Sequence, residues 1–230
     1  MLDAYKAVFF DAGGTLLHPY PSVGEIYATY AAKHGRQVQS DEVEARFRSA
    51  WLKRDGLTHL ASHSSGKVER QWWYELVRDV FDSLTTFENF DSFFDELYDV
   101  FARAQHWKLY PGVMNLLRHL KAGRKKIGII SNWDSRLLGI CEGLAITPHV
   151  DFILASAVFG VSKPNPKIFH EALRLSGVDP AEAVHIGDSF EDDVKGASAA
   201  GLHAILIERH PRHRKLEGIR TIHDLQELMG

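Results

Sequence analysis

From residue 109 onward, short apolar strands alternate with helical segments, and this alternation restricts the fold more than any other feature of the sequence. The apolar runs are KKIGIIS, DFILAS, AVHIGD and HAILIE, and helical patterns such as NPKIFHEALRLSG lie between them. Such alternation is typical of a parallel sheet built from right-handed βαβ units. We therefore expect an α/β fold with a parallel sheet.

The region before residue 109 has a different organisation. One apolar strand is predicted over Lys6 to Phe10, and it has no sheet of its own there. Amphipathic helical periodicity instead covers residues 23–34, 41–54, 67–84 and 90–104. We expect the first strand to join the later sheet. Residues 1–17 and 108–230 then form an α/β core, and residues 18–107 form an inserted all-helical cap.

Composition restricts the partners that the chain can bind. Its 230 residues are 45% hydrophobic, which is enough to bury a sizeable interior, and its formal net charge of -3 provides no overall positive field. We therefore expect a small-molecule substrate, with no nucleic acid and no membrane as partner. Because Cys141 is the single cysteine, an intrachain disulfide is excluded. We expect a cytoplasmic monomer or homodimer.

Polar side chains follow the predicted strands at the points where those strands end. They are Asp11, Thr15, Ser131, Asn132, Lys163, Asp188, Asp192 and Asp193. The carboxyl ends of parallel strands form one edge where ligands bind, although Asp11 alone is equally compatible with a helix N-cap. A divalent cation, most naturally Mg²⁺, relieves the repulsion between neighbouring carboxylates. The set is suited to holding a phosphoryl group against a nucleophilic aspartate.

The chain resembles the haloacid dehalogenase superfamily of hydrolases. Four motifs occur in the order typical of that family: DAGGTL, the strand-terminal serine of IISN, the lysine of GVSKPNPKIF, and GDSFEDDVKGA. The resemblance implies a Rossmann-like core with a helical cap inserted after the first motif. DAGGTL together with SNWDSRL is similar to the branch named after the rhythmically expressed gene 2 protein of flies.

This resemblance implies a role for each matching residue. Asp11 is expected to be the nucleophile that forms a covalent aspartyl intermediate, with Ser131 and Lys163 orienting and neutralising the transferring group. The expected ligands of Mg²⁺ are Asp11, the carbonyl oxygen of Gly13, Asp188 and Asp193, with Asp192 as the alternative to Asp193.

Four further residues are candidates for substrate binding. Thr15 and Asn132 belong to the polar set, and the Thr15 hydroxyl can donate a hydrogen bond to an anion. Trp133 and Arg136 follow the second motif and are expected to line the substrate entrance, with simple packing as an equal alternative for both.

The sequence departs from phosphatases of this superfamily at Gly13, where they usually carry an aspartate that protonates the leaving group. General acid–base catalysis contributes roughly 10² to 10⁴ in rate. One hypothesis is a phosphatase for leaving groups that need little protonation, such as acyl or aryl phosphates, or one that uses His18 as the acid. The others are a 2-haloacid dehalogenase or another carbon-centred hydrolase, and a catalytically weak protein that binds phosphorylated ligands. We prefer the phosphatase because Asp188 is retained.

Overall fold

The central layer of the molecule is a six-stranded parallel sheet with the strand order β5-β4-β1-β6-β7-β8. The computed structural model describes residues 2–57, 66–209 and 218–229. The strands are β1 (Ala7–Phe10), β4 (Lys126–Ser131), β5 (Phe152–Ala155), β6 (Ala183–Gly187), β7 (His203–Ile207) and β8 (Arg220–Ile222). The predicted α/β class and the recruitment of the first strand into the later sheet are confirmed.

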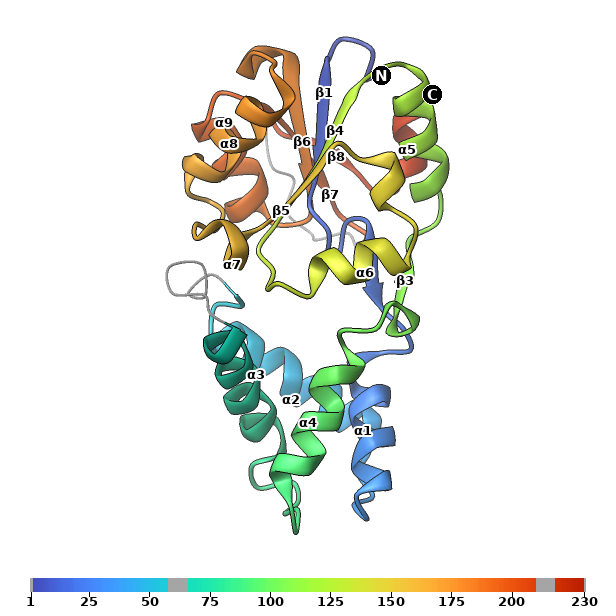
Figure 1. Cartoon of the computed structure of the whole chain (residues 1–230), viewed down its shortest axis with the longest axis vertical. Coiled ribbons are helices and arrows are strands. Elements are labelled where there is room, and N and C mark those ends of the chain that lie inside the picture. Colours follow the sequence, from blue (N-terminus) through green and yellow to red (C-terminus); the bar gives the residue numbers. More distant parts are fainter. Residues whose placement is uncertain (1, 58–65, 210–217, 230) are drawn as a thin grey trace.

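The apolar run AVFF forms β1 because the strand is covered on both faces. Val8 and Phe10 pack in one cluster and Ala7 and Phe9 in another, as expected when successive side chains alternate across a sheet. Helices α5 (Val113–Ala122) and α6 (Leu137–Gly143) cover the first face. Helices α8 (Pro166–Ser176) and α9 (Gly196–Ala199) cover the second, with the short α7 (Ser156–Phe159) following β5 (Figure 1).

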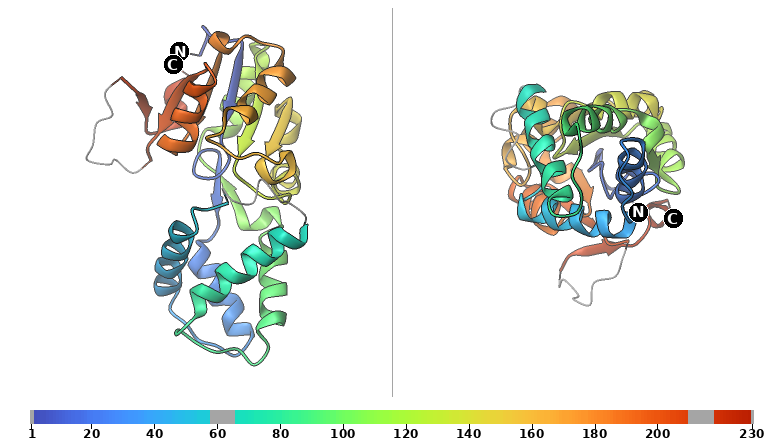
Figure 2. Two further views of the ribbon diagram at one scale, coloured as in Figure 1. Left: turned by 90° about the vertical axis from the view of Figure 1, so that its left-hand side faces the viewer. Right: turned by 90° about the horizontal axis from the view of Figure 1, so that it is seen from below.

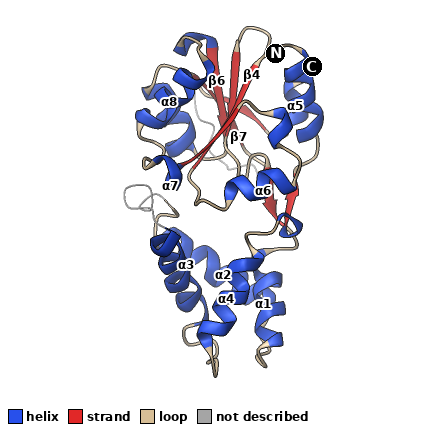
Figure 3. Cartoon of the chain, in the orientation of Figure 1, coloured by secondary structure: helices blue, strands red, loops and turns tan. Residues whose placement is uncertain are grey.

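Four helices form a separate group beyond the carboxyl ends of the strands, which we call the four-helix subdomain (Figures 1 and 3). They are α1 (Val23–Lys33), α2 (Ser40–Lys53), α3 (Gly66–Phe81) and α4 (Phe90–Val100). Their apolar faces meet in a core of their own that includes Tyr27, Val77 and Phe93. Both chain termini lie at the opposite end of the molecule (Figure 2). None of the helices in the described ranges is long and apolar enough to cross a membrane.

A short antiparallel ribbon connects the two parts. Strand β2 (Leu17–Pro19) pairs with β3 (Trp107–Leu109), and His18 lies opposite Lys108. The boundaries predicted for the cap, residues 18 and 107, fall on these strands. We did not predict the ribbon itself, because three residues are too few to show the alternation by which a strand is recognised.

The strand order places a topological switch point beside β1. The chain runs from β1 to β4 and β5 on one side, and then crosses to β6, β7 and β8 on the other. Loops at the carboxyl ends of β1, β4 and β6 therefore diverge and leave a crevice, which is where ligands bind in open α/β sheets. The four-helix subdomain faces this crevice.

Candidate active site

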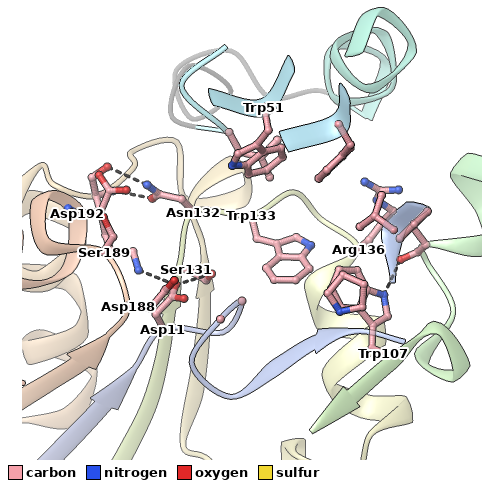
Figure 4. Close-up of a pocket in the computed structure, with 18 of the residues that line it drawn as sticks. Asp11, Trp51, Trp107, Ser131, Asn132, Trp133, Arg136, Asp188, Ser189 and Asp192 are labelled. Atoms are coloured by element: carbon pink, nitrogen blue, oxygen red, sulfur yellow. Dashed lines mark hydrogen bonds and ion pairs between the residues drawn. The ribbon is translucent and has the colours of Figure 1, made fainter. Parts of the chain in front are cut away.

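Asp11 lies at the centre of the crevice, directly after β1. Its side chain is almost buried, and its Oδ1 atom accepts hydrogen bonds from Ser131 Oγ at 2.8 Å and from Lys163 Nζ at 2.7 Å. Ser131 and Lys163, which are far from Asp11 in the sequence, thus both contact one of its carboxylate oxygens (Figure 4). Asp11 and Ser131 lie at the ends of the neighbouring strands β1 and β4. Burial raises the pKa of Asp11, and the ammonium of Lys163 opposes this shift.

Lys163 is a permanently charged member of the site. It is 2% exposed, and its Nζ also donates to Asp193 Oδ1 at 2.5 Å. Burial disfavours its charge, but Asp11 and Asp193 outweigh burial and raise its pKa above the ordinary lysine value. Lys163 therefore neutralises negative charge and does not donate a proton at neutral pH.

Asn132 positions Lys163 through the backbone. Its Nδ2 donates to the Lys163 carbonyl oxygen at 2.9 Å, and the Lys163 amide donates to its Oδ1 at 2.8 Å. Asn132 also lines the cavity described below. Since both ends of its amide are used, the contacts show that Asn132, which follows β4, fixes the loop between α7 and α8 that carries Lys163.

Asp188 and Asp193 bring two more carboxylates to Asp11. Oxygen atoms of the three side chains lie within 4.8 Å of one another. Burial, followed by the charges of Asp11 and Asp193, raises the pKa of Asp188 to about 7. Lys163 forms ion pairs with Asp11 and Asp193 but not with Asp188. Arg209 interacts electrostatically with Asp188. Three hard oxygen donors with an excess of negative charge fit a divalent cation such as Mg²⁺.

Gly14 allows Asp188 to approach the first loop. A Cβ atom at Gly14 would lie 2.5 Å from Asp188 Oδ2, and the φ angle of +77° is one that glycine adopts without strain. The second glycine of DAGGTL is thus required both by the backbone turn and by the acidic cluster.

A single turn of π-helix, η5 (Phe190–Lys195), distinguishes Asp193 from Asp192. Asp193 Oδ2 accepts the amide of Ser189 at 2.9 Å, and its Oδ1 lies 2.8 Å from His185 Nε2. Burial works to raise the pKa of Asp193, but Lys163 and His185 outweigh it and hold this pKa well below the usual range. Asp192 lines the cavity outside the three-carboxylate cluster.

Trp133 occupies the space beside Gly13. A Cβ atom at Gly13 would lie 3.0 Å from Cζ3 of the indole, although the backbone of Gly13 does not have the positive φ that requires glycine. The indole packs on Trp107, with ring centroids 4.9 Å apart (Figure 4). Trp133 therefore packs against the position where related phosphatases carry the aspartate, a contact that the sequence did not indicate.

A cavity of about 360 Å³ lies between the sheet edge and the four-helix subdomain. The polar residues described above line one end of it. The other part is lined by the aromatic side chains of Tyr27, Phe47, Trp51, Trp73, Phe101, Trp107 and Trp133.

Arg136 lines the cavity, and each of its three nitrogen atoms donates a hydrogen bond within the protein. Its Nε and Nη2 atoms donate to Asp134, which is fully buried, and Nη1 donates to the carbonyl oxygen of Tyr98 in α4 at 3.2 Å. Trp73 of α3 donates to the same Asp134 at 2.7 Å. Sequence analysis missed Asp134; its position two residues before Arg136 in SNWDSR is the signal that could have indicated the pair.

A second buried carboxylate, Glu69 of α3, also joins the four-helix subdomain to this loop, because the Ser135 hydroxyl donates to Glu69 at 2.7 Å.

Two candidates from the sequence do not line the cavity. Thr15 is completely buried, and its hydroxyl has no hydrogen-bond partner in the part of the chain that the structure describes. Its carbonyl oxygen instead accepts from Arg209 at 2.6 Å. His18 is held in β2 by pairing with β3, and its ring packs on Tyr110, with centroids 4.6 Å apart. Neither side chain is placed to contact a substrate at Asp11.

Comparison with known proteins agrees with this geometry. The chain is 35% identical over 204 residues to haloacid dehalogenase-like hydrolase domain-containing protein 3 of Bos taurus, covering 88% of this chain and 81% of that protein. It is 27% identical over 218 residues to the rhythmically expressed gene 2 protein of Drosophila melanogaster, covering 90% and 84%.

Two solved structures share the fold, with similar sequence identities and equal TM-scores. A haloacid dehalogenase-type phosphatase from Thermococcus onnurineus is 26% identical with a TM-score of 0.66, covering 97% of this chain and 95% of that one. A 2-haloacid dehalogenase from Pseudomonas syringae is 25% identical, also with a TM-score of 0.66, covering 98% and 96%. The family model for haloacid dehalogenase-like hydrolases matches residues 5–201. With the four motifs gathered around Asp11, these matches establish that the chain belongs to the haloacid dehalogenase-like hydrolase family.

Proposed function

We propose that this hydrolase is a Mg²⁺-dependent phosphatase that acts on a small phosphorylated metabolite through an aspartyl-phosphate intermediate. The observation that carries the proposal is the arrangement around Asp11: one oxygen is held by Ser131 and Lys163, and Asp188 and Asp193 complete a cluster of carboxylates. The structural similarity to the Thermococcus phosphatase agrees with it, and the equal TM-score to the Pseudomonas dehalogenase agrees with the second candidate below.

In this mechanism the free oxygen of Asp11 attacks phosphorus. A bond forms between that oxygen and phosphorus, and the bond from phosphorus to the leaving-group oxygen breaks, so that the leaving group departs with the electron pair. Water then attacks the aspartyl phosphate, releasing inorganic phosphate and restoring the carboxylate. Ser131 and Lys163 keep Asp11 in position, and Lys163 offsets charge on the transferring group.

A bound Mg²⁺ would be held by Asp11, Asp188, Asp193 and the Gly13 carbonyl, and would supply additional positive charge for the phosphoryl oxygens. The observed cluster fits this assignment, because Asp188 adds a carboxylate that Lys163 does not pair. Asp193 is preferred to Asp192 as a ligand because it belongs to the cluster.

A dehalogenase is the second candidate, and Gly13 is the feature that favours it. Departure of a halide needs no proton, so an active site without a side chain at position 13 is compatible with that reaction. Asp188 speaks against it, since a second acid beside the nucleophile is an electrostatic cost unless a cation is bound. A protein that binds phosphorylated ligands with little turnover is the third candidate.

Acetyl phosphate is the substrate of choice for the test, because its leaving group needs no general acid. We expect Mg²⁺-dependent release of phosphate by the wild-type protein and none by Asp11→Asn. Chloride release from 2-chloropropionate without Mg²⁺ would favour the dehalogenase instead. Metal-dependent binding of phosphate without turnover would favour the third candidate.

A matched pair of variants tests the metal ligands. Asp193→Asn removes a carboxylate of the cluster, while Asp192→Asn removes one that lines the same cavity outside the cluster. We expect a larger rise in the Mg²⁺ concentration needed for half-maximal activity in Asp193→Asn than in Asp192→Asn. The reverse order would reassign the ligand.

A further inference from the structure

The cavity bears on the identity of the substrate as well as on the reaction. We propose that the substrate is an aryl phosphate, a flat aromatic body that carries one phosphoryl group and no second anionic group. This inference rests on the proposed phosphatase function and specifies its substrate class. It follows from three independent features of the cavity: its charges, its aromatic walls and the space beside Gly13.

The first feature is that, among the described residues that line the cavity, each cation is already ion-paired with a carboxylate. Among the described residues that line it, the cations are Lys163 and Arg136. Lys163 pairs with Asp11 and Asp193. Arg136 pairs with the fully buried Asp134 and is 10% exposed. A carboxylate or second phosphate on the substrate would therefore be desolvated without meeting an unpaired cation among these described residues, which is unfavourable.

The second feature is a pair of aromatic walls. Trp107 and Trp133 pack together on the side of the sheet edge. Trp51 of the four-helix subdomain packs on Phe47 and Trp73, with centroid separations of 5.9 and 5.8 Å, and Figure 4 shows its ring facing the cavity opposite Trp133. Flat aromatic ligands are favoured between such surfaces because they bury apolar area and stack on the rings.

Arg136 adds to this apolar character. Its guanidinium lies over the ring of Tyr98 at 4.2 Å and over that of Trp73 at 4.9 Å. The charge is thus stabilised by aromatic faces as well as by Asp134, and Trp73 lines the cavity beside it.

The third feature is the leaving group that this site can release. With Trp133 against Gly13, the first loop offers no side chain to protonate the departing oxygen. An aryl oxide departs with the electron pair of the broken bond to phosphorus and needs less assistance from an acid than an alkoxide, because a phenol is the stronger acid. An aromatic body and a weakly basic leaving oxygen are properties of the same compound.

Binding of phosphonates to the Mg²⁺-loaded wild-type protein tests the inference without turnover. The probes are methylphosphonate, benzylphosphonate and 1-naphthylmethylphosphonate, with phosphonoacetate as the probe that carries a second anion. By isothermal titration calorimetry we expect Kd to fall at least about tenfold from methyl- to benzylphosphonate and again to the naphthyl compound. Phosphonoacetate should bind no more tightly than methylphosphonate.

A variant pair assigns the effect to the cavity wall. Trp51→Ala should reduce the ratio of the methyl- to naphthylmethylphosphonate Kd values by about tenfold. Trp72→Ala is the matched control, since Trp72 packs on Trp51, with centroids 5.7 Å apart, but does not line the cavity. It should leave that ratio within about twofold of the wild-type value.

Each alternative result overturns the inference. Equal Kd values for the three apolar probes, failure of all of them to bind, or tighter binding of phosphonoacetate would show that the cavity does not select an uncharged aromatic body. Hydrolysis of acetyl phosphate by the same preparation separates this failure from failure of the proposed function. Turnover of acetyl phosphate without aromatic selectivity would refute only the substrate class.

Discussion

Substituting aspartate for Gly13 tests how Trp133 limits the side chain at this position. The Cβ atom of Gly13→Asp would lie 3.0 Å from Trp133 Cζ3, which is closer than such atoms normally approach, so the ring must shift to admit the side chain. The indole packs on Trp107 and lines the cavity, so such a shift disturbs the packing of the two rings. We therefore expect the single variant to gain little activity and to lose about 1 to 3 kcal/mol of unfolding free energy through overpacking.

The double variant Gly13→Asp/Trp133→Ala removes the obstacle. A general acid contributes roughly 10² to 10⁴ in rate, so a partly aligned carboxyl group should raise kcat for an alkyl phosphate by roughly 10- to 10³-fold. Acetyl phosphate should show little gain, because its leaving group needs no proton. Trp133→Ala alone is the control for the added space.

Initial rates of phosphate release from ethyl phosphate and acetyl phosphate, measured for all four proteins, decide the question. If Gly13→Asp alone gains as much as the double variant, Trp133 does not exclude the acid. If a correctly folded double variant gains nothing on ethyl phosphate, the missing acid does not limit the reaction.

Three further predictions concern stability. Arg136→Met leaves the buried carboxylate of Asp134 without its cation. It should lower the unfolding free energy, measured with urea, by about 3 to 5 kcal/mol. In the control Arg174→Ala, which removes an exposed ion pair, the unfolding free energy should fall by no more than about 1 kcal/mol. Equal losses in the two variants would contradict the expectation that the buried pair of Arg136 matters more. Burial raises the pKa of Cys141 to about 12, so between about pH 9 and pH 12 the unfolded chain releases a proton that the folded protein retains. Stability should therefore fall as pH rises, and Cys141→Ala should remove up to about 1.4 kcal/mol per pH unit of this slope; an unchanged slope would exclude Cys141 as a source. Mg²⁺ should raise the thermal midpoint by binding the folded protein, and a similar rise in Asp188→Asn would contradict the assigned metal site.

The elements with strong periodicity could be predicted from the sequence. The helical stretch predicted over residues 23–34 is α1 (Val23–Lys33), and the one predicted over residues 90–104 ends earlier, at Val100. The gathering of Asp11, Ser131, Lys163 and Asp188 followed from their positions after parallel strands, because that topology brings strand ends together.

Tertiary packing explains what could not be predicted. The sequence marks Gly13 as a missing acid, but only the structure shows that the ring of Trp133, 120 residues away, packs against this position. Arg136 has the charge and position of a substrate ligand, yet it is ion-paired with Asp134 and donates to the carbonyl oxygen of Tyr98. Thr15 and His18 follow the nucleophile closely, but the turn and the pairing of β2 with β3 direct them away from the cavity.

The covalent role of Asp11 is tested most directly by trapping the intermediate. Protein mixed with acetyl phosphate and Mg²⁺ is quenched in acid within the first turnovers, digested and analysed by mass spectrometry. We predict one phosphoryl group on the peptide that contains Asp11, sensitive to hydroxylamine, and neither modification nor turnover in Asp11→Asn. Phosphate release at the wild-type rate by Asp11→Asn, with no modified peptide in either protein, would contradict the account.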